Sequence, residues 1–419
     1  MTTLLIVLFV ITYLAIALEH MLHINKSASA LLGAGLLWTI YAVTATDPAL
    51  VSEELGHTVA ETAQIIFFLI GAMTIVEVVD AHNGFDVVTA RVQTKSLAGL
   101  LCLIASITFF LSAILDNLTA TIVMVSLVRK LLKEHEERLF FAGMIVIAAN
   151  AGGAWSPIGD VTTTMLWIGH KVSTAPLILN TFIPSLLCII TPLIIARWLP
   201  AFKGNLTQGA INKSTNGRTE LLIGISLFLM VPLLKSLFHL PPYMGMLLAL
   251  CLFALYAEIK TKRNFKMTEV ESDLSPQSPT MKSLQKVELP TILFFLGILL
   301  TVAALESIGF IFNLGQSVQR AGISTQLFMG ILGIASAVID NVPLVAGAMG
   351  MFSYPMDHEA WHLLAYTAGT GGSILIIGSA AGVVAMGIEK ISFSWYLKRI
   401  APLAFIGYAV GYLFMRLIV

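Results

Sequence analysis

Apolar runs of about 20 residues recur along the whole chain, and they constrain its fold more than any other feature. An α-helix needs about 20 such residues to cross a bilayer, whereas a membrane-spanning strand shows about ten residues in alternation. Of the 419 residues, 57% are apolar and only 11% are charged, less than half of the ~25% usual in soluble domains. The pattern therefore predicts an all-α polytopic membrane protein in a lipid bilayer. With zero formal net charge, no nucleic-acid partner is expected.

The runs differ in kind along the chain. Single spanning helices are predicted at residues 3–24, 28–46, 61–81, 175–199, 220–239, 242–259, 289–307 and 399–417. Two further spans, 139–170 and 361–389, contain breaks. The segments 97–132 and 322–353 are too long for one span and carry polar residues at their middles, which predicts re-entrant hairpins. The stretches 201–219 and 261–287 are polar and are predicted to be solvated loops.

The distribution of Lys and Arg supports the hairpins. If both long segments enter and leave the membrane on the same side, 20 of the 24 basic residues, Lys26 among them, lie on one side. Basic loops face the cytoplasm in membrane proteins, so that side is predicted to be cytoplasmic. If either segment crossed the membrane once, everything after it would be flipped and the asymmetry would be lost.

The chain contains an internal repeat. The motif Ser112-Ala-Ile-Leu-Asp-Asn117 recurs as Ser336-Ala-Val-Ile-Asp-Asn341, and a Gly-Gly pair follows each copy. The order of helix, Asp-Asn hairpin, Gly-broken helix and helix thus occurs twice. Since the flanking charges predict that the two hairpins enter from opposite sides, the repeats are predicted to be inverted, which is typical of secondary transporters.

These observations predict four parts of the chain. They are 1–60, with N-terminal transmembrane helices; 61–200, the first inverted repeat; 201–287, with connecting loops and two transmembrane helices; and 288–419, the second inverted repeat. Each repeat is expected to hold one re-entrant hairpin and one broken transmembrane helix. The three cysteines lie in apolar runs at unrelated spacings and are interpreted as small buried side chains.

Asp116-Asn117 and Asp340-Asn341 are the strongest functional candidates. A charged side chain at the bilayer centre costs at least ~2.5 kcal/mol. No Lys or Arg occurs at 96–128, 139–170 or 321–389. The neutralising charge must therefore come from a distant segment, a proton or a bound cation, and this favours a cation as substrate over an anion. The alternative is helix capping by Asp or Asn. Both roles are compatible if Asn caps while Asp carries the charge.

The first broken helix adds oxygen ligands. Asn150 precedes its Gly-Gly break, Asp160 ends it, and Thr162 and Thr163 follow. Released backbone carbonyls, a carboxylate and hydroxyl groups suit a small hard cation such as Na⁺ or Li⁺. The second break holds Ser373 and Ser379 but no acid, so the predicted site is asymmetric in charge. Close helix packing is the other interpretation of the glycines.

Three further acids are interpreted from their positions. Glu77 and Glu306 lie near predicted helix ends, where they either extend to the interface or serve a proton path. Glu359 belongs to His358-Glu-Ala-Trp-His362, which matches the H-E-x-x-H pattern of zinc proteases. Because the motif opens a helix at the membrane edge, an interfacial position is the simpler interpretation. No zinc, no cofactor and no enzymatic activity are expected.

The paired hairpins, with Leu118-Thr-Ala-Thr121 after the first, and the stretch Asn150 to Thr164 resemble the NhaD family of sodium/proton antiporters. That family belongs to the ion transporter superfamily, together with arsenite permeases and divalent anion/sodium symporters. The resemblance covers residues from about 60 to the end. It implies that the following polar residues matter: Asp116, Asn117, Asn150, Asp160, Thr162, Thr163, Ser336, Asp340, Asn341 and Ser373.

The resemblance also implies an activity, the exchange of Na⁺ or Li⁺ for H⁺ across the bacterial inner membrane. Desolvation disfavours a charged carboxylate, so a proton or a cation is expected to neutralise the site in competition, with alternating access. Asp116 and Asp160 are the first candidates for the competing carboxylates, and Asp340 is the third. An anion or arsenite carrier of the same fold is the main alternative, although anion carriers of the superfamily have Ser-Asn-Thr-like tips. A homodimer is a candidate assembly.

Overall fold

The computed structural model describes residues 2–17, 24–45, 47–84, 96–199, 217–265, 283–285, 287 and 289–418. Within these ranges the regular elements are helices and no β-strand occurs, which confirms the all-α prediction. The loops predicted at 201–219 and 261–287 fall largely outside the described residues. The chain forms two compact units, one from 1–63, 94–209 and 293–419 and one from 64–93 and 210–292.

The helices of the first unit follow one another along the chain. They are α1 (Thr2–Ala17), α3 (Lys26–Thr44), the start of α4 (Pro48–Ala81), α6 (Leu97–Ser112), α7 (Asn117–Leu131), α8 (His135–Gly153), α9 (Val161–Ile168), α10 (Thr174–Ala196), most of α14 (Leu289–Ser307), α15 (Phe310–Arg320), α16 (Thr325–Ala335), α17 (Asn341–Met351), α18 (Glu359–Gly371), α19 (Ala380–Glu389), α20 (Phe393–Arg399) and α21 (Ala401–Ile418). The second unit holds the rest of α4, α11 (Arg218–Phe238) and α12 (Pro242–Phe265).

The apolar runs become helices of spanning length. In the described chain, α3, α4, α10, α11, α12 and α14 are long and apolar enough to cross a membrane, and α20 with α21, bent by 51°, would be a seventh span. The protein is therefore a multi-pass membrane protein. Two details differ from the prediction: α4 begins at Pro48 instead of residue 61, and α15 forms where no helix was expected. Residues 18–23 of the span predicted at 3–24 lie outside the described residues.

The segments predicted as hairpins and broken helices are divided as expected. The first hairpin consists of α6 and α7 around a turn that ends at Asp116, and the second consists of α16 and α17 around a turn that ends at Asp340. Helix α6, with 16 residues, is about 24 Å long, so it is too short to cross a core of about 30 Å alone. The two broken helices are α8–α9 and α18–α19.

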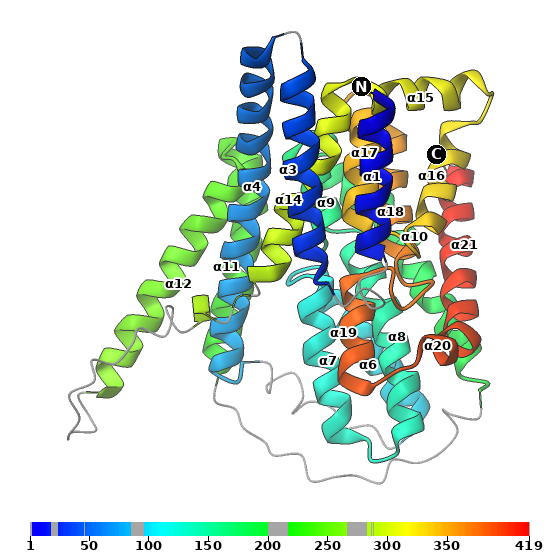
Figure 1. Ribbon diagram of the computed structural model, residues 1–419. Coiled ribbons are helices and arrows are strands. Elements are labelled where there is room, and N and C mark those ends of the chain that lie inside the picture. Colours follow the sequence, from blue (N-terminus) through cyan, green and yellow to red (C-terminus); the bar gives the residue numbers. More distant parts are fainter. Residues whose placement is uncertain are drawn as a thin grey trace. The chain divides into compact units, whose positions relative to one another are not determined.

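The two halves of the first unit repeat the same packing. Helix α6 packs on α8 as α16 packs on α18, and α7 lies beside α19 as α17 lies beside α9 (Figure 1). The Ser112 hydroxyl donates to the carbonyl of Ala149 at 2.6 Å, and the Ser336 hydroxyl donates to that of Ala368 at 2.8 Å. Each hairpin is thus tied to the broken helix of its own half. The inversion of the repeats remains a prediction.

Glycines permit these close contacts. A Cβ atom on Gly152 of α8 would lie 2.9 Å from the Cα of Phe109 in α6. On Gly371 of α18 it would lie 2.7 Å from the carbonyl carbon of Gly333 in α16. Real Cβ atoms do not approach backbone so closely. The Gly-Gly pairs therefore serve helix packing, and the release of backbone carbonyls toward a cation remains a prediction.

A buried ion-pair cluster lies at the far ends of α7 and α19. Glu389 ends α19, and only 2% of its side chain is exposed. Its carboxylate lies 3.0 Å from Nε of Arg138 and 3.4 Å from Nε of Arg129. His135 Nδ1 is 3.9 Å away. The cluster joins α7, α8 and α19, and so connects the two halves of the chain.

Replacing Glu389 with glutamine is expected to lower the free energy of unfolding by about 1.5–3 kcal/mol, because the charged hydrogen bond to Arg138 and the ion pair with Arg129 are lost. Thermal unfolding of detergent-solubilised protein measures this change. Glu136→Gln is the matched control, since Glu136 is exposed at the start of α8, between His135 and Arg138. Equal melting temperatures for the two variants would show that the cluster does not stabilise the fold.

Candidate functional site

Four helices of the first unit begin at the candidate site, and each has a side-chain cap. Asp116 caps α7, Asp160 caps α9, Asp340 caps α17 and Ser379 caps α19. The first free N–H groups of a helix and its dipole favour negative charge at this end. Capping therefore explains why short polar residues stand here. It does not explain why three of the four caps are acids, because Ser379 performs the same task without charge.

Asp160 lies at the centre of a hydrogen-bond network. It is 3% exposed. One carboxylate oxygen accepts from the N–H and the hydroxyl of Thr162 at 2.8 and 2.7 Å. The other accepts from Nδ2 of Asn117 at 2.5 Å. Asn117 also donates to Oδ1 of Asn150 at 3.2 Å, and Asn150 donates to the Ser379 hydroxyl at 3.0 Å. The network thus links the first hairpin to both broken helices.

Asp116 has an unusual backbone. Its φ is 139° and its ψ is 163°, a region that essentially only glycine adopts and that costs other residues about 1–3 kcal/mol. Its carboxylate accepts from the N–H and the hydroxyl of Thr119 at 2.7 and 2.9 Å. Strained backbone conformations are more frequent at functional sites than elsewhere. Here the strained residue places its carboxylate within electrostatic range of Asp160.

Replacing Asp116 with glycine is expected to raise the melting temperature and to abolish transport. Glycine relieves the strained φ, whereas loss of a cap to glycine costs only a few tenths of a kcal/mol. Asp340→Gly is the control, because Asp340 has a φ of −47° and no strain to relieve. Thermal unfolding in detergent checks the stability. A fall as large as that of the control would contradict the strain at Asp116.

Asp340 has a basic partner. One of its carboxylate oxygens lies 3.5 Å from Nζ of Lys26, the first residue of α3. The sequence interpretation placed Lys26 among the basic residues of the predicted cytoplasmic side and did not predict this pair; its side chain is 27% exposed and lies against the second hairpin. Of the three neutralising charges considered from sequence, the distant segment is the one found at Asp340. Asp340 also lies within electrostatic range of Asp160.

The remaining predicted ligands are buried but differ in their contacts. Thr162, Thr163, Ser336 and Ser373 are fully buried, and Asn341 is 4% exposed. The Ser336 hydroxyl also contacts Oδ1 of Asn341. The Thr163 hydroxyl donates to the carbonyl of Asp160 at 2.9 Å, and that of Ser373 donates to the carbonyl of Thr370 at 2.7 Å. Thr162 therefore joins the carboxylate network directly, whereas the Ser373 hydroxyl turns back onto its own helix.

The two glutamates proposed for a proton path lie elsewhere. Glu77 lies in the part of α4 that belongs to the second unit. Glu306 is exposed near the end of α14, close to Gly350 of α17, where a Cβ atom would lie 2.9 Å from the Glu306 carboxyl carbon. A role in a proton path remains a prediction for both.

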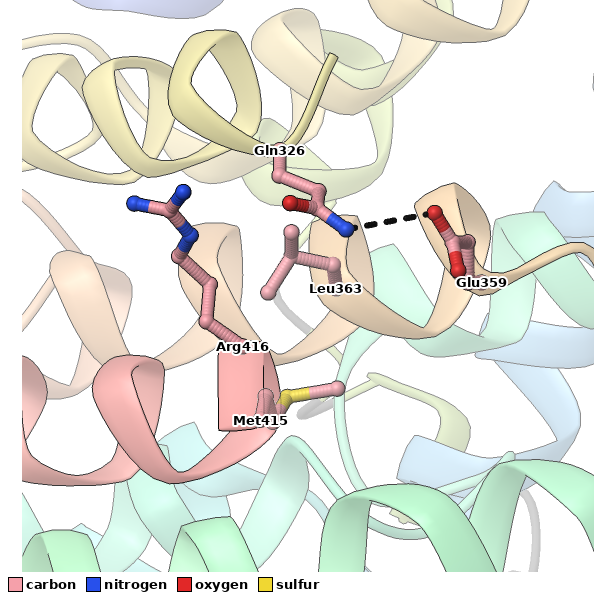
Figure 2. Close-up of a pocket in the computed structure, with 5 residues that line it drawn as sticks. All are labelled: Gln326, Glu359, Leu363, Met415 and Arg416. Atoms are coloured by element: carbon pink, nitrogen blue, oxygen red, sulfur yellow. Dashed lines mark hydrogen bonds between the residues drawn. The ribbon is translucent and has the colours of Figure 1, made fainter. Parts of the chain in front are cut away.

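The H-E-x-x-H residues point in different directions. His358 caps α18 by accepting the Ala360 N–H at 3.2 Å. Glu359 accepts from Gln326 at 3.3 Å. His362 is buried and lies 3.5 Å from Asp357. Figure 2 shows Glu359 turned toward Gln326 at a small pocket between α16, α18 and α21, lined by Gln326, Glu359, Leu363, Met415 and Arg416. The motif therefore does not form a zinc-protease site.

Asp116 and Asp160 together offer an oxygen-rich, negatively charged site. In the described part of the chain, neither lies within ion-pair distance of a basic side chain. Carboxylate and hydroxyl oxygens are the ligands of small hard cations. The arrangement is therefore suited to hold either a cation or a proton, and it is poorly suited to an anion.

Comparisons with known proteins define the class and then the family. The family described as citrate transporter (CitMHS) matches residues 6–369. The chain is 43% identical over 412 residues to Sodium/proton antiporter 1 of Arabidopsis thaliana, across 96% of this chain and 70% of that protein. It is 32% identical over 430 residues to the Na⁺/H⁺ antiporter NhaD of Alkalimonas amylolytica, across 96% and 88%.

A solved structure agrees in fold. The crystal structure of the Alcanivorax borkumensis YdaH transporter matches with a TM-score of 0.59 at 10% identity, over 94% of this chain and 98% of that one. Together the fold and the relatives define a polytopic membrane transporter and not an enzyme. The chain belongs to the CitMHS family, and its resemblance to the NhaD antiporters is confirmed.

Lys26 and Thr119 were not among the predicted site residues. Thr119 follows Asp116 by three positions, a capping spacing that sequence alone could have shown. Lys26 is the only Lys or Arg among the first 90 residues, and this isolation could have marked it as a candidate. No sequence motif near Lys26 indicates Asp340 as its partner. Its partner is visible only in the folded chain.

Proposed function

We propose that this protein is a secondary transporter that moves Na⁺ out of the cytoplasm in exchange for H⁺, with Li⁺ as an alternative cargo. The observation that carries the proposal is the buried Asp160 beside Asp116, without a basic partner in the described residues. Relatives named as sodium/proton antiporters, at 43% and 32% identity, support it. The family name, citrate transporter, supports the anion alternative.

Competition at one site couples the two ions in this proposal. Removing a carboxylate from water is costly unless it is neutralised, so either a proton or a metal cation has to accompany the closed site through the membrane. Alternating access then exchanges one for the other, and the proton-motive force sets the direction. Inverted repeats with broken helices at the site are the architecture that such alternation uses.

The location and assembly belong to the same proposal. A bacterial inner membrane is the proposed location, which the similarity to bacterial NhaD proteins supports, and the relatives also include plant proteins. A homodimer and the surrounding lipid remain predictions, which cross-linking in native membranes and native mass spectrometry would test.

The proposal is tested in everted membrane vesicles that carry the protein and report a pH gradient by fluorescence quenching. Na⁺, Li⁺ and K⁺ are added in turn at alkaline pH. Dissipation of the gradient by Na⁺ or Li⁺ supports exchange. Vesicles with the same amount of protein that respond to no cation, but that accumulate labelled citrate, would instead support the anion carrier.

A further inference from the structure

We infer that Lys26 is a built-in counter-ion that neutralises Asp340, so that only Asp116 and Asp160 remain open to the transported cation and the proton. This inference rests on the proposed function, and it deepens it by assigning different tasks to the three acids of the site. It also gives the N-terminal helices, which carry none of the NhaD motifs, a role in transport.

Specific contacts fix the position of Lys26. Its backbone is fixed because Asn25 caps α3, accepting from the N–H and the hydroxyl of Ser27 at 2.9 and 2.8 Å. Its ammonium group lies 3.5 Å from the Asp340 carboxylate and 4.4 Å from the centre of the Phe294 ring of α14. An anion on one side and an aromatic face on the other stabilise a cation in place.

The helix that carries Lys26 is anchored to α14. The indole N–H of Trp38 donates to the carbonyl of Leu300 at 2.9 Å, and the hydroxyl of Thr301 lies 3.3 Å from the carbonyl of Ala30. Both bonds end at consecutive residues of α14, Leu300 and Thr301. Lys26 therefore reaches Asp340 from a rigid pair of helices.

The two hairpins differ in this respect. Asp116 and Asp340 occupy the same position in the repeated motif and both cap the following helix. The Asp340 carboxylate lies 3.5 Å from Nζ of Lys26, whereas the Asp116 carboxylate accepts hydrogen bonds from the N–H and the hydroxyl of Thr119. Within the described residues, the duplicated site is thus made asymmetric by one lysine from outside the repeats. Asp340 becomes a structural anion, and the two acids of the first half keep their negative charge for cargo.

The inference predicts an interaction between two substitutions. Lys26→Gln leaves the negative charge of Asp340 without its counter-ion and is expected to lower the half-saturating Na⁺ concentration roughly tenfold. A negative charge about 10 Å from a bound cation strengthens cation binding by about that factor at an effective dielectric constant near 20. Asp340→Asn leaves the Lys26 charge and is expected to raise that concentration by a similar factor. The double variant, which is neutral at both positions, is expected to return to within about threefold of the wild type.

The experiment measures exchange against Na⁺ concentration in everted vesicles for the wild type, both single variants, the double variant and Lys26→Arg, with folded protein quantified by size-exclusion chromatography. Lys26→Arg keeps the charge and is expected to keep the wild-type Na⁺ concentration. A role in folding alone would change the maximum rate and the amount of protein, not the half-saturating concentration. An unchanged concentration in Lys26→Gln would overturn the inference.

Two further outcomes also test the inference: a variant that does not fold, and wild-type vesicles that respond to no cation. If a single variant fails to fold, the double variant alone decides, because a half-saturating concentration more than tenfold from wild type would contradict the inference. If wild-type vesicles respond to no cation, the proposed function fails. The increase in melting temperature of the purified variants with added Na⁺ then reports cation binding. The half-saturating Na⁺ concentration is again expected to be lowest for Lys26→Gln and highest for Asp340→Asn.

Discussion

Replacing Asp160 with serine is expected to abolish cation exchange while the protein remains folded. Ser379 shows that serine suffices as the cap at the matching point of the second half, where it accepts the Gly382 N–H at 3.2 Å. Serine therefore preserves the cap of α9 and removes the charge, together with the oxygen that accepts from Asn117. Asp160→Asn is a poorer test of charge, since its amide would meet the Asn117 donor that now lies 2.5 Å from the carboxylate.

The expected loss is large because the Asp160 carboxylate is a ligand of the transported cation in the proposed function. Hydrogen bonds to a charged group contribute about 1.5–3 kcal/mol each, so losing even one cation ligand of this kind changes binding at least tenfold. Everted vesicles measure the exchange, and size-exclusion chromatography in detergent verifies the fold. Ser379→Asp is the reciprocal variant, with a charge added at the matching cap. Wild-type exchange by Asp160→Ser would remove Asp160 from the mechanism.

The acids of the site are distinguished by their neighbours and not by their sequence context. Asp116 and Asp340 stand in nearly identical hexapeptides, so a motif alone predicts the same role for both. In the fold, one is held at a strained φ near Asp160 and the other is paired with a lysine from α3. A duplicated motif can therefore supply two different functions once a segment outside the repeat reaches one copy.

Much of the fold could be predicted from sequence because hydropathy and capping are local properties. The ends of α10, α14 and α19 follow from apolar runs that stop at polar or Gly-rich residues. The cap at Asp160 follows from an acid at a break, two residues before a threonine. Helix α15 was not predicted because its 11 residues are amphipathic and not uniformly apolar. Residues 48–60 of α4 are polar enough that the apolar run begins only after them.

The contacts of the site could not be predicted to the same degree. The bonds from Asn117 to Asp160 and from Asn150 to Ser379 join segments that are distant in the chain, and no periodicity encodes such a distance. Sequence indicated which polar residues stand in costly places, because an unneutralised charge or an unpaired polar group in an apolar run needs a partner. The fold then decides which partner each residue finds.

Replacing Gly152 with valine is expected to prevent stable folding, and this is the largest effect on stability that the structure predicts. A side chain there would overlap the backbone of Phe109, with Cβ 2.9 Å from its Cα, so α6 and α8 would have to move apart. Overpacking costs about 3 kcal/mol or more when backbone has to move. Helix α8 carries Asn150 and α6 leads into the turn that ends at Asp116, so the network around Asp160 would separate with them.

Gly387 supplies the matched control, because nothing lies within 4 Å of a Cβ atom built there. Gly387→Ala is expected to keep or slightly raise stability, since alanine favours a helix over glycine by about 1 kcal/mol. Fluorescence-detected size-exclusion chromatography and thermal unfolding measure both variants. Gly371→Val, at the equivalent contact with Gly333, is expected to behave as Gly152→Val does. Monodisperse Gly152→Val protein with a wild-type melting temperature would show that α6 and α8 are not packed in contact, and the position of both hairpins on their broken helices would then have to be abandoned.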